Sequence, residues 1–215
     1  SAFREVLNCP GGTSFSLFEL RPGGHLSRLE EIHLLQDLMV ANGVTPNDLK
    51  KFVQLPNLQS LSAHSARIDA SSITALLGAP SLTKIDIEGS NFNDGHAALI
   101  AESKKITDLE NGTTRITRTG LEAICGMAQL QALDIWANRL NEEDFDLLSS
   151  LQKLEYLSVG SHDDQTDYTF EGTFPMLERL SSLKHVWLDG FRVTKAQWEC
   201  LNERFEKVRV TSVED

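Results

Sequence analysis

The most constraining feature of this chain is an apolar pattern that recurs along most of its length. The pattern L-x-x-L-x-L begins eight times, and successive beginnings lie 23, 24, 24, 24, 24, 29 and 22 residues apart. Its first residues are Leu35, Leu58, Leu82, Ile106, Leu130, Leu154, Leu183 and Phe205. Positions four and six are mostly apolar and alternate with outward positions, which is the periodicity of a short β-strand. Such a unit cannot bury its apolar side alone, so the units must stack on one another.

A second apolar pair follows the strand in each of seven units. The pairs are Leu49 and Phe52, Ile73 and Leu76, Ala97 and Ile100, Leu121 and Ile124, Phe145 and Leu148, Phe174 and Leu177, and Trp198 and Leu201. A spacing of three residues places both members on one side of a helix, so each pair, Trp198 included, is predicted to face the core. Polar residues at 45–48 and 141–144 precede two of the pairs, as a helix N-terminus prefers.

These repeats resemble those of leucine-rich repeat proteins from Leu35 to Val210. The resemblance implies an α/β solenoid with a parallel β-sheet on its concave face and helices on its convex face. The 24-residue period and helical back resemble the ribonuclease-inhibitor-like class, and the threonine-rich helix starts resemble bacterial repeats. The family usually has Asn or Cys at position nine, where only Asn138 fits here. The other equivalents are Ala66, Ser90, Thr114 and Phe191.

The two ends of the repeat array differ from its middle. Residues 1–34 are predicted to be an N-terminal capping segment with a degenerate repeat, in which Phe15, Phe18 and Leu20 take positions one, four and six. Residues 35–215 are predicted to form one continuous solenoid domain of about eight repeats. Residues 160–173 contain five residues beyond the period, and we expect them to form a loop beside the binding face.

The composition excludes several classes of partner. The chain has 31 acidic and 20 basic residues, a formal charge of -11, which opposes non-specific binding to nucleic acid. No apolar run approaches the roughly 20 residues that span a bilayer, so no membrane insertion is expected. The cysteines Cys9, Cys125 and Cys200 have neither a CxxC nor a zinc spacing. We expect a soluble acidic monomer whose compartment the sequence leaves unknown.

The outward positions of the strands provide the candidate binding residues. Positions five and seven, with position three of one repeat, predict an acidic cluster of Asp86, Glu88, Asp108, Glu110 and Asp134. Beside it, the same positions predict an aromatic stretch of Trp136, Tyr156, His185 and Trp187, followed by Asp189. Exposed aromatic residues next to charge are typical anchors of protein interfaces, and an acidic field with indole rings suits a partner that carries Lys or Arg. The alternative is that the acidic residues form an ordinary solvated face.

No catalytic or metal-binding motif is visible. The chain lacks G-x-S-x-G, a P-loop, G-x-G-x-x-G and H-E-x-x-H, and its six histidines show no ligand spacing. Residues 162–167 offer oxygen ligands but lack the order and the glycine of an EF-hand loop, which favours a solvated loop. Asp86 and Asp134 lie two strands apart, roughly 9–10 Å, near the separation of inverting glycosidases, yet nothing is expected to raise one pKa selectively. We therefore expect no catalytic residue, no metal and no cofactor.

Residues 111–113 form a glycosylation sequon, Asn-Gly-Thr. Asn111 takes position six, which the repeat turns inward, so a buried amide is expected in place of a glycan. Such an amide needs hydrogen-bond partners, and we expect it to replace part of the missing position-nine ladder.

The sequence as a whole predicts a non-catalytic module that recognises a protein or peptide on its concave face. Two alternatives stay open. The first residue is Ser1, which suggests a targeting domain excised from a larger enzyme or effector. Alternatively, aromatic rings beside carboxylates are typical of a carbohydrate-binding face.

Overall fold

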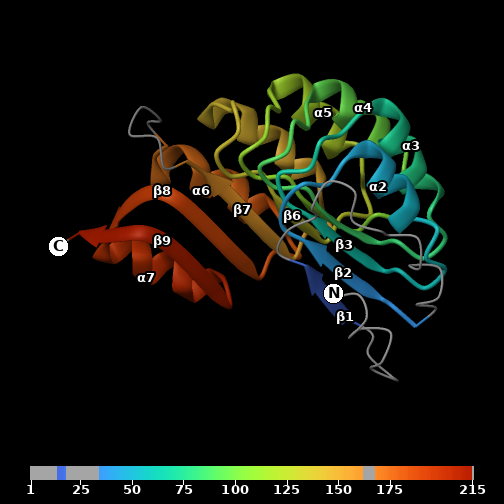
Figure 1. The fold of residues 1–215 in the computed structure, drawn as a ribbon. Coiled ribbons are helices and arrows are strands. Elements are labelled where there is room, and N and C mark those ends of the chain that lie inside the picture. Colours follow the sequence, from blue (N-terminus) through green and yellow to red (C-terminus); the bar gives the residue numbers. More distant parts are fainter. Residues whose placement is uncertain (1–13, 18–33, 162–167, 215) are drawn as a thin grey trace.

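The computed structural model describes residues 14–17, 34–161 and 168–214, and there it forms one nine-stranded parallel sheet in the order β1 to β9 (Figure 1). The strands are β1 (Ser14–Leu17), β2 (Asp37–Val40), β3 (Ser60–Ala63), β4 (Lys84–Asp86), β5 (Asp108–Glu110), β6 (Ala132–Asp134), β7 (Tyr156–Gly160), β8 (His185–Thr194) and β9 (Lys207–Glu214). The helices are α2 (Pro46–Phe52), α3 (Ala70–Gly78), α4 (Asp94–Ile100), α5 (Arg118–Cys125), α6 (Phe170–Arg179), α7 (Lys195–Arg204) and the 3-10 helix η2 (Glu142–Ser150).

Equal positions of successive repeats pair with one another across the sheet. Leu61 pairs with Ile85, Ile85 with Leu109, and Leu109 with Leu133, so position four forms one continuous buried row. Figure 1 shows helices α2 to α6 along one side of this sheet, and the buried side chains form one cluster between the strands and the helices. The predicted α/β solenoid, with strands on the concave face and helices on the convex face, is confirmed.

The register of the N-terminal strand differs from the prediction. Phe15 pairs with Leu38 and Leu17 pairs with Val40, so Phe15 takes position four and Leu17 takes position six. The assignment of Phe15 to position one was therefore wrong, because strand pairing sets the register and Phe15 and Leu17 have the same two-residue spacing as Phe18 and Leu20. The predicted positions of Phe18 and Leu20, and most of the capping segment, lie outside the described residues.

Polar N-caps begin the helices, as the sequence indicated. The side chains of Thr45, Asp69 and Thr194 each accept a hydrogen bond from the backbone three residues on and form capping boxes. The fifth unit forms a 3-10 helix, η2, where an α-helix was expected, and Phe145 and Leu148 are nevertheless buried.

The predicted apolar pairs deviate toward the C-terminus. In α6 the core side is formed by Thr173, Met176 and Leu177, whereas Phe174 is half-buried and stacks on Phe170 with ring centres 4.7 Å apart. Trp198 of α7 is likewise half-buried against the core. A helix in a solenoid is covered by its neighbours on both sides, and α7, the last of the described helices, has a described helix on one side only.

In each central repeat, the turn after the strand contains a residue in the left-handed backbone conformation. Position eight has a positive φ of 52–67° at Ser65, Gly89, Thr113 and Ala137. The backbone N–H of each donates a hydrogen bond of 2.7–3.0 Å to a position-seven carbonyl of the next repeat, at Glu88, Gly112, Trp136 and Gly160. These bonds fix the backbone of position seven, from which two of the candidate binding side chains extend.

The interior polar ladder is short and differs from the expected one. Asn138 donates from Nδ2 to the backbone carbonyls of Asn111 and Ile135, and its Oδ1 accepts from Thr114 Oγ1 and the Ile116 N–H. Asn111 is fully buried, as predicted, but its side-chain amide has no hydrogen-bond partner among the residues that the structure describes. The expectation that this amide replaces the ladder was therefore wrong, because the backbone carbonyl of Asn111 is the group that accepts.

The inserted segment after β7 is anchored at its C-terminal end. Tyr168 donates from its hydroxyl to the Leu140 carbonyl and stacks on Phe191 with ring centres 5.5 Å apart. Residues 162–167, including the predicted solvated loop, lie outside the described residues.

In the described part of the chain, Cys125 and Cys200 are free thiols, and burial raises the pKa of Cys125 to about 12. None of the described helices has the length and apolar character needed to cross a bilayer.

Candidate binding surface on the concave face

Three acidic residues align in one row across the centre of the sheet. Asp86 of β4 pairs with Glu110 of β5, which pairs with Asp134 of β6. Parallel strands lie about 4.8 Å apart, so their carboxylates repel one another unless protons or cations intervene. The register therefore brings the position-five members of the predicted acidic cluster together.

Part of this negative charge is balanced within the fold. Asp86 is 6% exposed, and its Oδ2 accepts from Ser62 Oγ at 2.7 Å and lies 2.5 Å from His64 Nε2. Glu110 forms an ion pair with Lys84. Both contacts join neighbouring repeats, and local spacing in the sequence does not display them.

Two carboxylates of the cluster have raised pKa values. Burial raises the pKa of Asp134 from 3.8 to about 7, although the Trp136 N–H donates to it, and the nearby Glu110 and Glu88 carboxylates add to the increase. Burial also raises the pKa of Glu88, with Asp86 and Glu110 acting in the same direction and His64 opposing them. The expectation that nothing on this face raises one pKa selectively was wrong, because the concave surface is closed enough at β6 to desolvate Asp134.

A groove of about 320 Å³ lies over β1 to β5 on this face. Its lining includes Met39, which is 43% exposed, together with Lys84, Asp86 and Glu110. The groove thus has an apolar side chain beside the acidic row. Met39 and Lys84 take the outward positions five and three of their repeats, and neither was among the predicted binding residues.

The predicted aromatic stretch forms two separate parts, the Tyr156–Trp187 pair and Trp136. Tyr156 and Trp187 form an edge-to-face pair with ring centres 5.3 Å apart, and Trp187 is 37% exposed. The Arg209 guanidinium lies over the Trp187 ring, 5.3 Å from its centre. Aromatic edge-to-face and cation–π contacts of this kind fix a ring in place while leaving part of its surface accessible.

Trp136 occupies a different environment from that pair. A Cβ atom built on Gly112 would lie 2.5 Å from the Trp136 indole, so the ring packs directly on the glycine backbone. Only a residue without a side chain permits this close approach. Trp136 is half-buried, and its ring borders the acidic cluster on the side of β5.

The remaining predicted residues are placed at the margins. Asp108 is half-buried and accepts from Thr107 Oγ1 at 2.6 Å. His185 Nε2 lies 3.9 Å from a carboxylate oxygen of Glu206. Asp189 has the predicted outward register but is only 9% exposed, so little of it is available to a partner.

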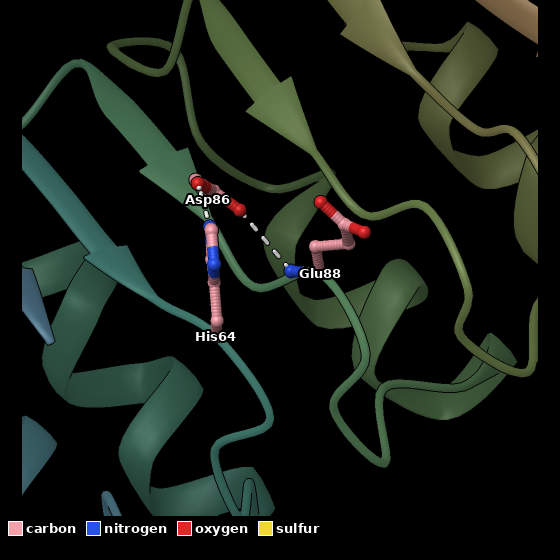
Figure 2. Close-up of side chains that lie close together, drawn as sticks. All are labelled: His64, Asp86 and Glu88. Carbon is pink, nitrogen blue, oxygen red and sulfur yellow. Dashed lines mark hydrogen bonds and ion pairs between the residues drawn. The ribbon is translucent and has the colours of Figure 1, made fainter. Parts of the chain in front are cut away.

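One group of side chains was missed at the edge of the acidic cluster. His64, Asp86 and Glu88 each offer a ligand atom, and these atoms lie within 4.8 Å of one another (Figure 2). The sequence showed no ligand spacing for the histidines, because His64 follows β3 and the two acids belong to the next repeat.

The concave sheet, the convex helices and the repeating register define a leucine-rich repeat solenoid. Among solved structures, this chain is similar to two internalins of Listeria monocytogenes. One, inlF, shares 23% identity over 89% of this chain and 53% of its own, with a TM-score of 0.56. The other, inlC2, shares 21% identity over 81% of this chain and 70% of its own, also with a TM-score of 0.56. The chain thus spans about half the length of the first internalin, and the likeness establishes the fold.

No protein-family model matches the chain, and no curated protein sequence matches it. The particular function must therefore be argued from the concave surface itself.

Proposed function

We propose that this chain is a non-catalytic, monomeric recognition module that binds a Lys- or Arg-bearing protein segment on its concave face. The observation that carries the proposal is the acidic row of Asp86, Glu110 and Asp134, which borders the groove. The net charge of -11 steers basic partners toward the protein and opposes nucleic acid.

The acidic row retains negative charge that the fold does not balance. Lys84 and His64 are positioned against Glu110 and Asp86, whereas Asp134 forms no ion pair with any described residue, and burial, aided by the nearby Glu110 and Glu88 carboxylates, raises its pKa to about 7. A Lys or Arg side chain would supply the missing positive charge. Because a cation stabilises the ionised carboxylate, binding should release a proton from Asp134 near neutral pH.

The aromatic end of the face supplies contact area. Trp187 and Tyr156 present a rigid, partly exposed pair, and Arg209 already rests against the indole. Tryptophan and tyrosine at such positions are frequent binding hot spots. We place the partner across β4 to β8, with its cations on the acidic row and an apolar or cationic side chain against Trp187.

The test selects displayed random short peptides for binding to the intact chain. Selection should enrich Lys- and Arg-bearing peptides, and the Glu110→Gln/Asp134→Asn double variant should bind them about tenfold or more weakly, a loss of at least about 1.4 kcal/mol. Trp187→Ala should weaken them to a similar degree. Glu178→Gln, an exposed acid on the convex helix α6, is the matched control and should bind as the wild type does.

Enrichment of peptides without cations, or equal loss in the control variant, would contradict the proposed partner. The proposed absence of catalysis needs a separate test, because a pKa near 7 is what a general acid requires. Turnover of aryl glycosides that Asp134→Asn abolishes would show that this face is an active site.

A further inference from the structure

His64, Asp86 and Glu88 form a compact group of potential metal ligands on three successive parts of the chain. His64 follows β3, Asp86 ends β4, and Glu88 lies in the turn after β4 (Figure 2). One ligand atom from each lies within 4.8 Å of the other two. The group thus combines an imidazole nitrogen and two carboxylate oxygens in one place.

The positions of these atoms are close to those of a coordination sphere. Zinc binds imidazole nitrogen and carboxylate oxygen at roughly 2.0–2.2 Å in tetrahedral geometry, which places ligand atoms roughly 3.3 Å apart. His64 Nε2 and Asp86 Oδ2, now 2.5 Å apart, would separate by less than an ångström, and the Glu88 carboxylate would turn toward them. The Glu88 side chain would have to rotate for its carboxylate to complete the group.

The charge of the group favours a cation. Asp86 accepts hydrogen bonds from Ser62 and from the Glu88 N–H in addition to its contact with His64. By contrast, the Glu88 carboxylate forms no hydrogen bond or ion pair with any residue in the described ranges. With a neutral imidazole, the group carries two negative charges on a half-buried surface. A dication would balance both, whereas a proton on His64 balances only one.

Ser62 adds a supporting contact of the kind that metal sites use. Its hydroxyl donates to Asp86 Oδ2 at 2.7 Å and holds that carboxylate in the position that faces His64. Hydrogen bonds from outside the coordination sphere commonly orient ligands in this way. The β3–β4 pairing in turn fixes Ser62 opposite Asp86.

We propose that His64, Asp86 and Glu88 bind a divalent transition-metal ion of the Zn²⁺ type, with one position left for water. The imidazole ligand favours Zn²⁺ over Mg²⁺ and Ca²⁺, which prefer sites built of oxygen. This site requires no peptide partner, so its test is independent of the proposed recognition function.

The experiment is calorimetric titration of the intact chain with ZnCl₂, joined to crystallography at the zinc absorption edge. We expect one zinc equivalent, with an anomalous peak between the three side chains. His64→Gln and Glu88→Gln should each weaken binding by about tenfold or more. His185→Gln removes a histidine that lies near another acid, Glu206, on this sheet and should leave zinc binding unchanged.

Glu88→Gln also separates loss of a ligand from loss of folding. Because no described residue bonds to that carboxylate and burial raises its pKa, this variant should unfold without metal at a temperature no lower than that of the wild type. Zinc affinity equal to the wild type in either ligand variant, an anomalous peak at another site, or no zinc uptake would overturn the proposal. In those cases the group is a hydrogen-bonded His–Asp pair with a neighbouring acid.

Discussion

The centre and the C-terminal end of the concave sheet are built differently. Strands β4, β5 and β6 have three residues each, and their outward side chains, apart from Ala132, are charged, partly or fully buried and close to one another. Strands β8 and β9 have ten and eight residues, and no residue of β9 is buried. The centre concentrates charge on a rigid surface, whereas the end presents aromatic area at a less buried edge.

This contrast follows from position in the solenoid. A central repeat is covered by neighbours on both sides, so its core residues are fully buried and its outward charges are crowded by the adjacent strands. Strand β9 has a described neighbour on one side only, and none of its residues is buried. We therefore propose that the charged centre provides partner specificity and that the aromatic end provides contact area.

The largest expected effect is on core packing. Leu109→Ala, at a fully buried position of β5, should lower the free energy of unfolding by about 2–5 kcal/mol. Val208→Ala, at the same repeat position in half-buried β9, should cost about 1 kcal/mol. Urea denaturation of both variants measures the difference. Equal losses would mean that the terminal repeat is buried as deeply as the centre.

The next effect depends on pH. The pKa of Asp134 is about 7 in the folded chain against 3.8 for a free carboxyl, so the folded protein holds this proton more tightly than the unfolded one. Its stabilising contribution is complete below about pH 4 and is lost as the pH rises through 7. Asp134→Asn should therefore be more stable than the wild type by about 1–3 kcal/mol at pH 8. Thermal unfolding of the wild type and of Asp134→Asn at pH 4 and pH 8 measures this difference in stability. A difference that did not grow with pH would contradict the prediction.

A smaller effect concerns the turns of the central repeats. Thr113 has a φ of 53°, which is costly for a β-branched residue, while Gly89 holds the same repeat position at 67° without that cost. Thr113→Gly should raise the free energy of unfolding by about 0.5–1 kcal/mol. Gly89→Ala is the reverse test and should be destabilising. A loss of stability in Thr113→Gly would show that the threonine side chain contributes more than its strain costs.

The smallest effect concerns an ion pair of the acidic row. Lys84→Gln removes the cation that faces Glu110 in a partly exposed pair, so stability should change by less than about 1 kcal/mol. The freed Glu110 should bind a selected basic peptide two- to fivefold more tightly, as fluorescence anisotropy at low salt would measure. Weaker binding would indicate that Lys84 itself contacts the partner.

The sequence predicted the architecture because the repeat constrains it strongly. Eight apolar patterns in register determine which residues pair, so rows such as Leu61, Ile85 and Leu109 follow from subtraction alone. The degenerate first repeat lacks that redundancy, and the register of Phe15 was misassigned there.

The site was predictable only in part. The outward positions gave the alignment of Asp86 with Glu110, but not their partners His64 and Lys84, which depend on side-chain conformations between strands. The raised pKa of Asp134 depends on burial, and sequence periodicity carries no measure of how closed a concave surface is.

The most direct test of concave-face recognition is a crystal structure of the chain with a peptide chosen by display. We expect the peptide to cross β4 to β8, with a Lys or Arg side chain on the carboxylates of Glu110 and Asp134 and a contact to Trp187. A peptide bound along the helices of the convex face would contradict it.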